Sequence, residues 1–203
     1  GLTLEKVVAF SYLGDTVQAN GGAQQAVRAR IKTAWMKWRE ISPLLVRKDI
    51  TLKIRALAYK IYIRSALLYS SETWALTKKD TSALVRTELR MLRKLMGANS
   101  TERSEEHVRR TTNVEKMEEV LRSRRLEWFG HVMRMRDDCW IKKCMKFETE
   151  GKRSVGRPLI RWMDLVKSDM KTRGVTQEMT QKRSEWRTVV QAKRLTPGNR
   201  GNT

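Results

Sequence analysis

The chain has 203 residues, with 43 Lys or Arg against 22 Asp or Glu, which gives a formal net charge of +21 and an isoelectric point near 10.6. This charge makes a polyanion the expected partner, nucleic acid first, while 40% apolar residues with seven Trp exclude a disordered basic tail. The two cysteines, Cys139 and Cys144, exclude a disulfide framework, and without an apolar leader segment the chain is expected to be intracellular, in the nucleus and/or cytoplasm.

The first elements predicted are a short strand and a long helix. Lys6 to Leu13 is rich in β-branched and aromatic residues and stops at Gly14, which predicts a strand entering a turn, and little else resembles strand. From Gln24 to about Leu45 apolar residues recur at helical spacing, and Pro43 is expected to end or kink this helix. The basic residues on another face of the helix are Arg28, Lys32 and Arg39.

A second helix is predicted from about Ile50 to Tyr69. Its expected buried stripe is Ile54, Leu57, Ile61 and Leu68, and a separate basic stripe is Lys53, Lys60 and Arg64. These charges exclude a membrane span. Residues 28 to 64 hold eleven Lys or Arg against Glu40 and Asp49, a local charge of +9 and the most basic part of the chain.

Start and stop residues indicate the later helices. A capping box at Thr77 to Asp80 opens a helix that ends at Gly97 in an expected left-handed cap. Ser104 marks the start of a short helix and Asn113 that of a long one. Gly151 to Pro158 is predicted to be a basic linker, followed by an amphipathic helix ending near Gly174 and a last helix after Thr176.

The predicted fold class is mainly α: a helical bundle preceded by a short strand, with a second, smaller helical C-terminal extension. The predicted segments are a strand and turn (1–22), a helical domain (23–100), a tryptophan-motif helical region (101–150), a basic linker with C-terminal helices (151–194) and a disordered tail (195–203).

Seven segments in order carry a resemblance to a known family. The two most informative are RRLEWFGHVMRMR (124–136) and GRPLIRW (156–162); the others are FSYLG (10–14), residues 28–45, LLYSSETW (67–74), residues 90–97 and RSEWR (183–187). In this order they resemble the C-terminal region of the reverse transcriptases of LINE-type, non-LTR retrotransposons of the RTE or BovB-like group. One departure is Ser70, where the family motif has Gly.

The resemblance implies that residues 1–22 are the end of a polymerase region, that residues 23–100 form a thumb-like domain, and that a C-terminal extension without a catalytic centre follows. The family places its metal-binding aspartates in an A-D-D motif upstream of F-x-Y-L-G, and this sequence has no such motif. Its adjacent pair, Asp137 and Asp138, lies beyond that position and is interpreted as a solvated loop. No enzymatic activity and no cofactor are therefore expected of this chain, and Mg²⁺ is expected only for the missing polymerase domain.

The two basic stripes are the first candidates for a nucleic-acid contact. Lys and Arg on a rigid helix contact successive phosphates without reading bases, and the polymerase thumb implied by the resemblance would do this along a duplex. A solvated charged face is the alternative. The local excess of +9, which acids do not balance, favours phosphate contact.

Two later segments add candidates. Arg124, Arg125 and His131 flank an aromatic pair that offers a stacking platform, although the spacing of Trp128, Val132 and Met135 favours a buried stripe for Trp128. GRP at 156–158 is similar to part of an AT-hook, but a linker whose Pro158 starts the next helix is favoured. The basic residues of this stretch remain phosphate candidates: Lys152, Arg153, Arg157 and Arg161.

A zinc site is a weaker hypothesis. His131, Cys139 and Cys144, with His107, supply enough ligands, but their spacing fits no standard finger. Buried thiols and a capping histidine are the favoured interpretation, so no metal is predicted.

The sequence therefore predicts a nucleic-acid-binding fragment of an RNA-directed DNA polymerase. Its expected partners are RNA and DNA, as an RNA–DNA or DNA duplex, together with the missing polymerase and endonuclease domains and no membrane. The alternatives are a free-standing basic helical DNA-binding or scaffolding protein derived from a transposable element, or a non-functional relic.

Overall fold

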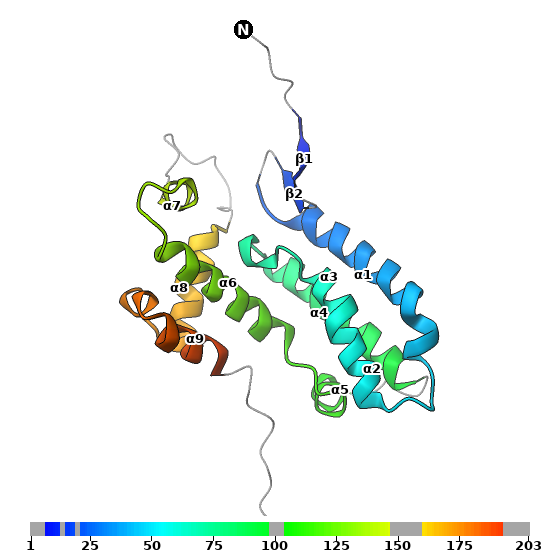
Figure 1. Ribbon diagram of the computed structural model, residues 1–203. Coiled ribbons are helices and arrows are strands. Elements are labelled where there is room, and N and C mark those ends of the chain that lie inside the picture. Colours follow the sequence, from blue (N-terminus) through cyan, green and yellow to red (C-terminus); the bar gives the residue numbers. More distant parts are fainter. Residues whose placement is uncertain (1–6, 13–14, 19–20, 98–103, 147–159, 193–203) are drawn as a thin grey trace, which may run out of the picture. The chain divides into compact units, whose positions relative to one another are not determined.

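The computed structural model describes residues 7–12, 15–18, 21–97, 104–146 and 160–192 (Figure 1). It divides the chain into two compact units. The first unit is formed by residues 1–70 and 76–117, and the second by residues 71–75 and 118–203. Residues 104–117 thus belong with the predicted thumb-like segment, and the helices after residue 160 belong with the tryptophan motif.

The first unit begins with a two-stranded antiparallel sheet. β1 (Ala9–Tyr12) pairs with β2 (Asp15–Gln18), with Phe10 opposite Val17 and Tyr12 opposite Asp15. β1 lies within the predicted strand, whereas β2 was not predicted. The sequence DTVQ contains two β-branched residues, Thr16 and Val17, but is too short to be recognised as a strand without its pairing to β1.

Helix α1 (Gln24–Leu45) matches the predicted range. Val27, Ala34, Trp38 and Leu45 are buried, so the helical spacing of the apolar residues identified the core face correctly. The helix continues only two residues past Pro43. Proline cannot donate to the carbonyl of Arg39, and the hydroxyl of Ser42 donates to that oxygen instead, at 3.0 Å.

The next helical stretch contradicts the predicted buried stripe. It consists of α2 (Leu52–Ala58), a π-helix η1 (Tyr59–Arg64) and α3 (Ser65–Leu67). Of the predicted stripe only Leu68 is buried, and Ile54, Leu57 and Ile61 are more than half exposed. The other buried residues are Tyr59, Ile63 and Leu67. From Tyr59 to Leu67 the buried residues recur every four positions, so helical spacing fits either face of this stretch and the prediction chose the wrong one.

Ser70 follows this stretch with φ 64°, in the left-handed region. Glycine adopts this conformation without steric cost, whereas serine does not. Helix α4 (Lys78–Met96) then begins with the predicted capping box: Asp80 N–H donates to Thr77 Oγ1 at 3.2 Å, and Thr77 N–H donates to Asp80 Oδ2 at 3.1 Å. The helix stops before Gly97 as predicted, but Gly97 has φ 107° and ψ 173°, not a left-handed helical cap.

Helix α5 (Glu105–Thr112) completes the first unit, with the side chain of Ser104 accepting from His107 N–H as an N-cap. Asn113 does not start the following helix as predicted. It ends α5 in the left-handed conformation, with φ 51°, and α6 (Met117–Met133) begins four residues later. Asn favours both helix starts and left-handed helix ends, so the residue alone does not distinguish them.

The second unit contains a 3₁₀ turn η2 (Ser71–Thr73), most of α6, then α7 (Trp140–Lys146), α8 (Trp162–Arg173), the 3₁₀ turn η4 (Glu178–Gln181) and α9 (Arg183–Ala192). Gly174 ends α8 in the left-handed conformation, with φ 66°. This agrees with the predicted end of that helix.

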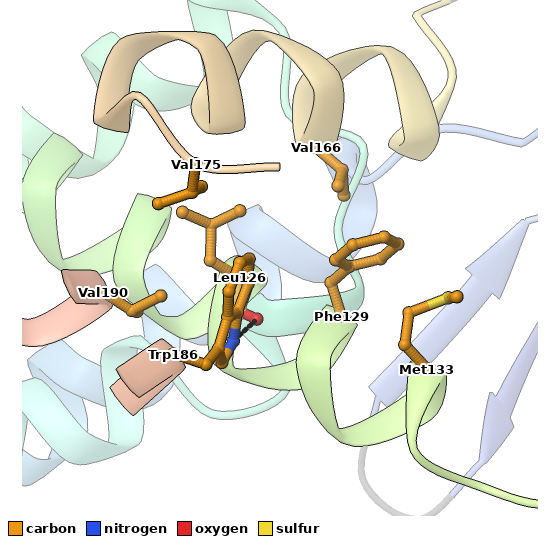
Figure 2. Close-up of a cluster of buried hydrophobic side chains, with 7 residues drawn as sticks. All are labelled: Leu126, Phe129, Met133, Val166, Val175, Trp186 and Val190. Atoms are coloured by element: carbon orange, nitrogen blue, oxygen red, sulfur yellow. Dashed lines mark hydrogen bonds between the residues drawn. The ribbon is translucent and has the colours of Figure 1, made fainter. Parts of the chain in front are cut away.

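The core of the second unit joins α6, α8 and α9 (Figure 2). Its buried residues are Leu126, Phe129, Met133, Val166, Val175, Trp186 and Val190. The ring of Phe129 lies 6.4 Å from the rings of both Trp162 and Trp186. The segments 124–136, 156–162 and 183–187, which carry part of the resemblance, therefore contribute to one core. The structure also confirms the mainly helical fold class with a short strand region near the start of the chain.

Candidate nucleic-acid interface

The basic residues of α1 lie on its exposed face. Arg28, Lys32 and Arg39 are all exposed, and none makes an ion pair within the described part of the chain. Trp35 lies on the same face, three residues after Lys32, and is half-buried. The helix therefore presents a row of positive charge about 16 Å long, from its 1.5 Å rise per residue.

The second predicted row does not face solvent as a whole. Lys53 is exposed, but Lys60 is half-buried with its Nζ 3.0 Å from Glu115 Oε1, and Arg64 is buried. Arg64 follows the buried Ile63 and meets the carboxylates of Glu88 and Glu115 instead of solvent. Of these three residues, only Lys53 is exposed and makes no ion pair with another described residue.

Arg64 belongs to a buried network of charges. Its Nε lies 2.8 Å from Glu88 Oε1 as an ion pair, and its Nη1 donates to Glu115 Oε2 at 2.7 Å. Arg109 Nη1 donates to Glu88 Oε2 at 2.8 Å, so the fully buried Glu88 faces two guanidinium groups. Tyr59 donates to the same carboxylate at 3.4 Å, and burial followed by the charge of Glu88 raises the pKa of this phenol well above its ordinary value. The network joins η1 and α5 to α4.

Arg125 in the tryptophan motif is also buried. Its Nη1 donates to Asp169 Oδ2 at 2.6 Å, and Arg122 Nε donates to Asp169 Oδ1 at 3.2 Å. Burial lowers the pKa of Arg125 and raises the pKa of Asp169, against the effect of their pairing. Arg125 and Arg122 together neutralise the buried carboxylate of Asp169, so Arg125 serves the packing of α6 on α8. Arg124, its neighbour, is half-buried.

The prediction that Trp128 is buried in the core is wrong. Val132 is buried, but Trp128 and Met135 are only half-buried, and the core face of α6 is formed by Leu126, Phe129 and Met133. The ring of Trp128 lies 5.5 Å from that of the exposed His131. The spacing of Trp128, Val132 and Met135 predicted a face that only borders the core. Because Trp128 and Phe129 are adjacent, the helical pattern fits a buried stripe through either residue.

The basic linker falls largely outside the described residues. Lys152, Arg153, Arg157 and Pro158 all lie there, and so does the predicted tail. Arg161 is described and exposed, and its backbone N–H donates to Asp164 Oδ2 at 3.3 Å at the start of α8. Arg161 therefore remains a candidate contact.

The structure brings together no zinc ligands. Within its described residues no three His, Cys, Asp or Glu side chains form a group that could hold a metal ion. The thiol of Cys139 donates to Met135 Sδ at 3.7 Å, and Cys144 is exposed. The exposed acids Asp137 and Asp138 pair with Lys142 and Arg136, which agrees with the interpretation of a solvated loop.

A row of basic residues on α4 was missed in the sequence. Lys79, Arg86, Arg90 and Lys94 are all exposed, and their spacing of seven, four and four residues places them on one helix face. That spacing is visible in the sequence, although the charge is denser between residues 28 and 64.

Comparison with known proteins supports a transposon-related origin. Over 200 residues the chain is 26% identical to an uncharacterized transposon-derived protein of Caenorhabditis elegans, in an alignment that covers 92% of this chain and 71% of the relative. No protein-family model and no solved structure matches the chain. None of the described helices is long and apolar enough to cross a membrane.

Proposed function

We propose that this chain is the nucleic-acid-binding, thumb-like C-terminal part of a non-LTR retrotransposon RNA-directed DNA polymerase. Its role is to hold an RNA–DNA or DNA duplex beside a polymerase centre carried elsewhere, without supplying catalytic residues itself. The resemblance of seven ordered segments favours this family, and the similarity to a transposon-derived protein supports a transposon-related origin.

The observation that carries the proposal is the exposed row Arg28, Lys32 and Arg39 on α1. An isolated cation on a protein surface is ordinarily neutralised by a nearby acid or by mobile ions. Here three guanidinium or ammonium groups share one rigid helix face and have no acidic partner in the described part of the chain. Such a row exchanges its mobile counterions for phosphates, which gives binding that depends on salt and tolerates many sequences.

Fluorescence anisotropy with a labelled 20-base-pair DNA duplex and an RNA–DNA duplex of the same sequence tests the binding. The affinity is expected to fall steeply as salt rises. The triple variant Arg28→Ala, Lys32→Ala, Arg39→Ala should reduce the slope of log affinity against log salt by about 2 to 3, since each phosphate contact contributes about 0.9. A matched control is Lys48→Ala, Arg110→Ala, Lys116→Ala, three exposed residues outside this row. Affinity that does not change with salt would exclude the proposal.

The polymerase assignment has a separate test. If the reading frame continues upstream of Gly1 through an A-D-D motif and an endonuclease region, the chain is part of a copying enzyme. An initiating Met close to Gly1 would instead favour a free-standing basic protein derived from the element.

A further inference from the structure

Helix α4 carries a second row of unneutralised positive charge. Lys79, Arg86, Arg90 and Lys94 are exposed on one face, and no ion pair within the described residues involves them. The two acids of α4 do not offset this row, because Asp80 is buried in the capping box and Glu88 is buried between Arg64 and Arg109. The row extends over about 22 Å of helix.

A contact between the two helices places this row beside the row on α1. The two helices pack against each other, and Lys94 Nζ lies 5.8 Å from the centre of the Trp35 ring. Trp35 belongs to the same face of α1 as Arg28, Lys32 and Arg39. Since packed helices lie about 8–10 Å apart, the surface has two roughly adjacent lines of cations.

The aromatic ring of Trp35 lies at this surface, but it is half-buried, and Lys94 Nζ lies 5.8 Å from its centre. Proteins that bind single strands offer free aromatic faces on which bases stack. This surface offers charge in two lines instead, which suits the two phosphate chains of a double helix.

We propose that Lys79, Arg86, Arg90 and Lys94 of α4 form a second phosphate-binding row, and that α1 and α4 each contact one strand of the same duplex. This inference rests on the proposed function, because it assigns the ligand of the same surface. Contacts along two protein helices fix the orientation of a bound duplex, whereas contacts along one protein helix leave the duplex free to rotate about that helix.

The test uses the full chain and three labelled probes: the 20-base-pair DNA duplex, the RNA–DNA duplex and the matching single-stranded DNA. The variant Lys79→Ala, Arg86→Ala, Arg90→Ala, Lys94→Ala should lower duplex affinity at least about tenfold and reduce the salt slope by about 3 to 4, with a smaller loss for the single strand. The control removes four exposed cations elsewhere, Lys48, Arg110, Lys116 and Lys167.

Lys94 contacts Trp35, so a triple variant that keeps Lys94 separates loss of binding from loss of packing. This triple variant should also lose more affinity for the duplex than for the single strand, with the salt slope reduced by about 2 to 3. If the unaltered chain shows no salt-dependent duplex binding, both the proposed function and this inference are overturned. If the chain binds, the α1 variant weakens it and the α4 variants behave like the control, the inference alone is overturned. An equal loss for duplex and single strand would also overturn it.

Discussion

The indole of Trp186 in α9 lies directly against the backbone of Gly130 in α6. A Cβ added to Gly130 would lie 2.2 Å from Trp186 Nε1, and that nitrogen donates to the carbonyl of Leu126 at 3.1 Å (Figure 2). Gly130 belongs to the segment EWFGHV and Trp186 to RSEWR. The glycine of the first motif is therefore required by the tryptophan of the second, some 56 residues later in the chain.

Gly130→Ala is expected to destabilise the second unit by about 1–3 kcal/mol, because overpacking a buried ring exceeds the gain in helix propensity of about 1 kcal/mol. Urea unfolding followed by circular dichroism measures this. In a Trp186→Phe background, where the six-membered ring replaces the larger indole, the cost of Gly130→Ala should shrink. An equal cost in both backgrounds would show that Trp186 is not its cause.

Glu88→Gln should destabilise the first unit by about 3 kcal/mol. Removing one partner of a buried ion pair costs about 3–5 kcal/mol, and the lower end applies because Arg64 retains Glu115 and Arg109 retains Glu105. Chemical denaturation gives the change in free energy of unfolding. Glu106→Gln, on the exposed surface of α5, is the control, and a similar small effect of both substitutions would contradict the network.

Ser70 allows a test of backbone strain. Both Ser70→Gly and Ser70→Ala remove the hydroxyl, but only glycine adopts φ 64° without steric cost. The glycine variant should therefore be more stable than the alanine variant by about 1 kcal/mol. Thermal unfolding of the two variants under identical conditions provides the comparison, and equal midpoints would show that the turn is unstrained.

Lys53 and Lys60 form a matched pair for binding. Lys53 is exposed, whereas Lys60 is held 3.0 Å from Glu115. Lys53→Ala should reduce the salt slope of duplex binding by about 0.9, and Lys60→Ala should leave it nearly unchanged. Anisotropy titrations at several salt concentrations measure the two salt slopes. A larger effect of Lys60→Ala than of Lys53→Ala would show that the ion pair between Lys60 and Glu115 opens on binding.

Glu115 makes the first unit sensitive to acid. Burial acts to raise its pKa, but hydrogen bonds from its own backbone and from Lys60, together with the charge of Arg64, lower the pKa below its ordinary value of 4.5. The stabilisation is thus fully present above pH 4.5 and is lost as the pH falls through the lower folded-state pKa. The difference in unfolding free energy between the unaltered chain and Glu115→Gln should shrink over that range. A difference that is constant with pH would contradict this linkage, and Glu106→Gln is again the control.

Local signals in the sequence predicted much of the fold. The spacing of Val27, Ala34 and Trp38 predicted the core face of α1, and the Thr77 and Asp80 pair predicted the start of α4. These features depend on neighbours within a few residues, so a sequence contains them directly. The buried face between Leu52 and Leu67 could not be recognised in this way, because helical spacing fits two faces of this stretch. Ile61 is exposed and Arg64 is buried, the reverse of the prediction.

For the candidate interface, the sequence by itself determined the charge, the helical rows and the resemblance to a retrotransposon enzyme. Only the tertiary structure decided which cations remain available. Arg64 and Arg125 are held by Glu88 and Asp169, which lie 24 and 44 residues away, whereas Arg28, Lys32 and Arg39 face solvent. Charge is a property of each residue, but its neutralisation depends on which distant acids the fold places beside it.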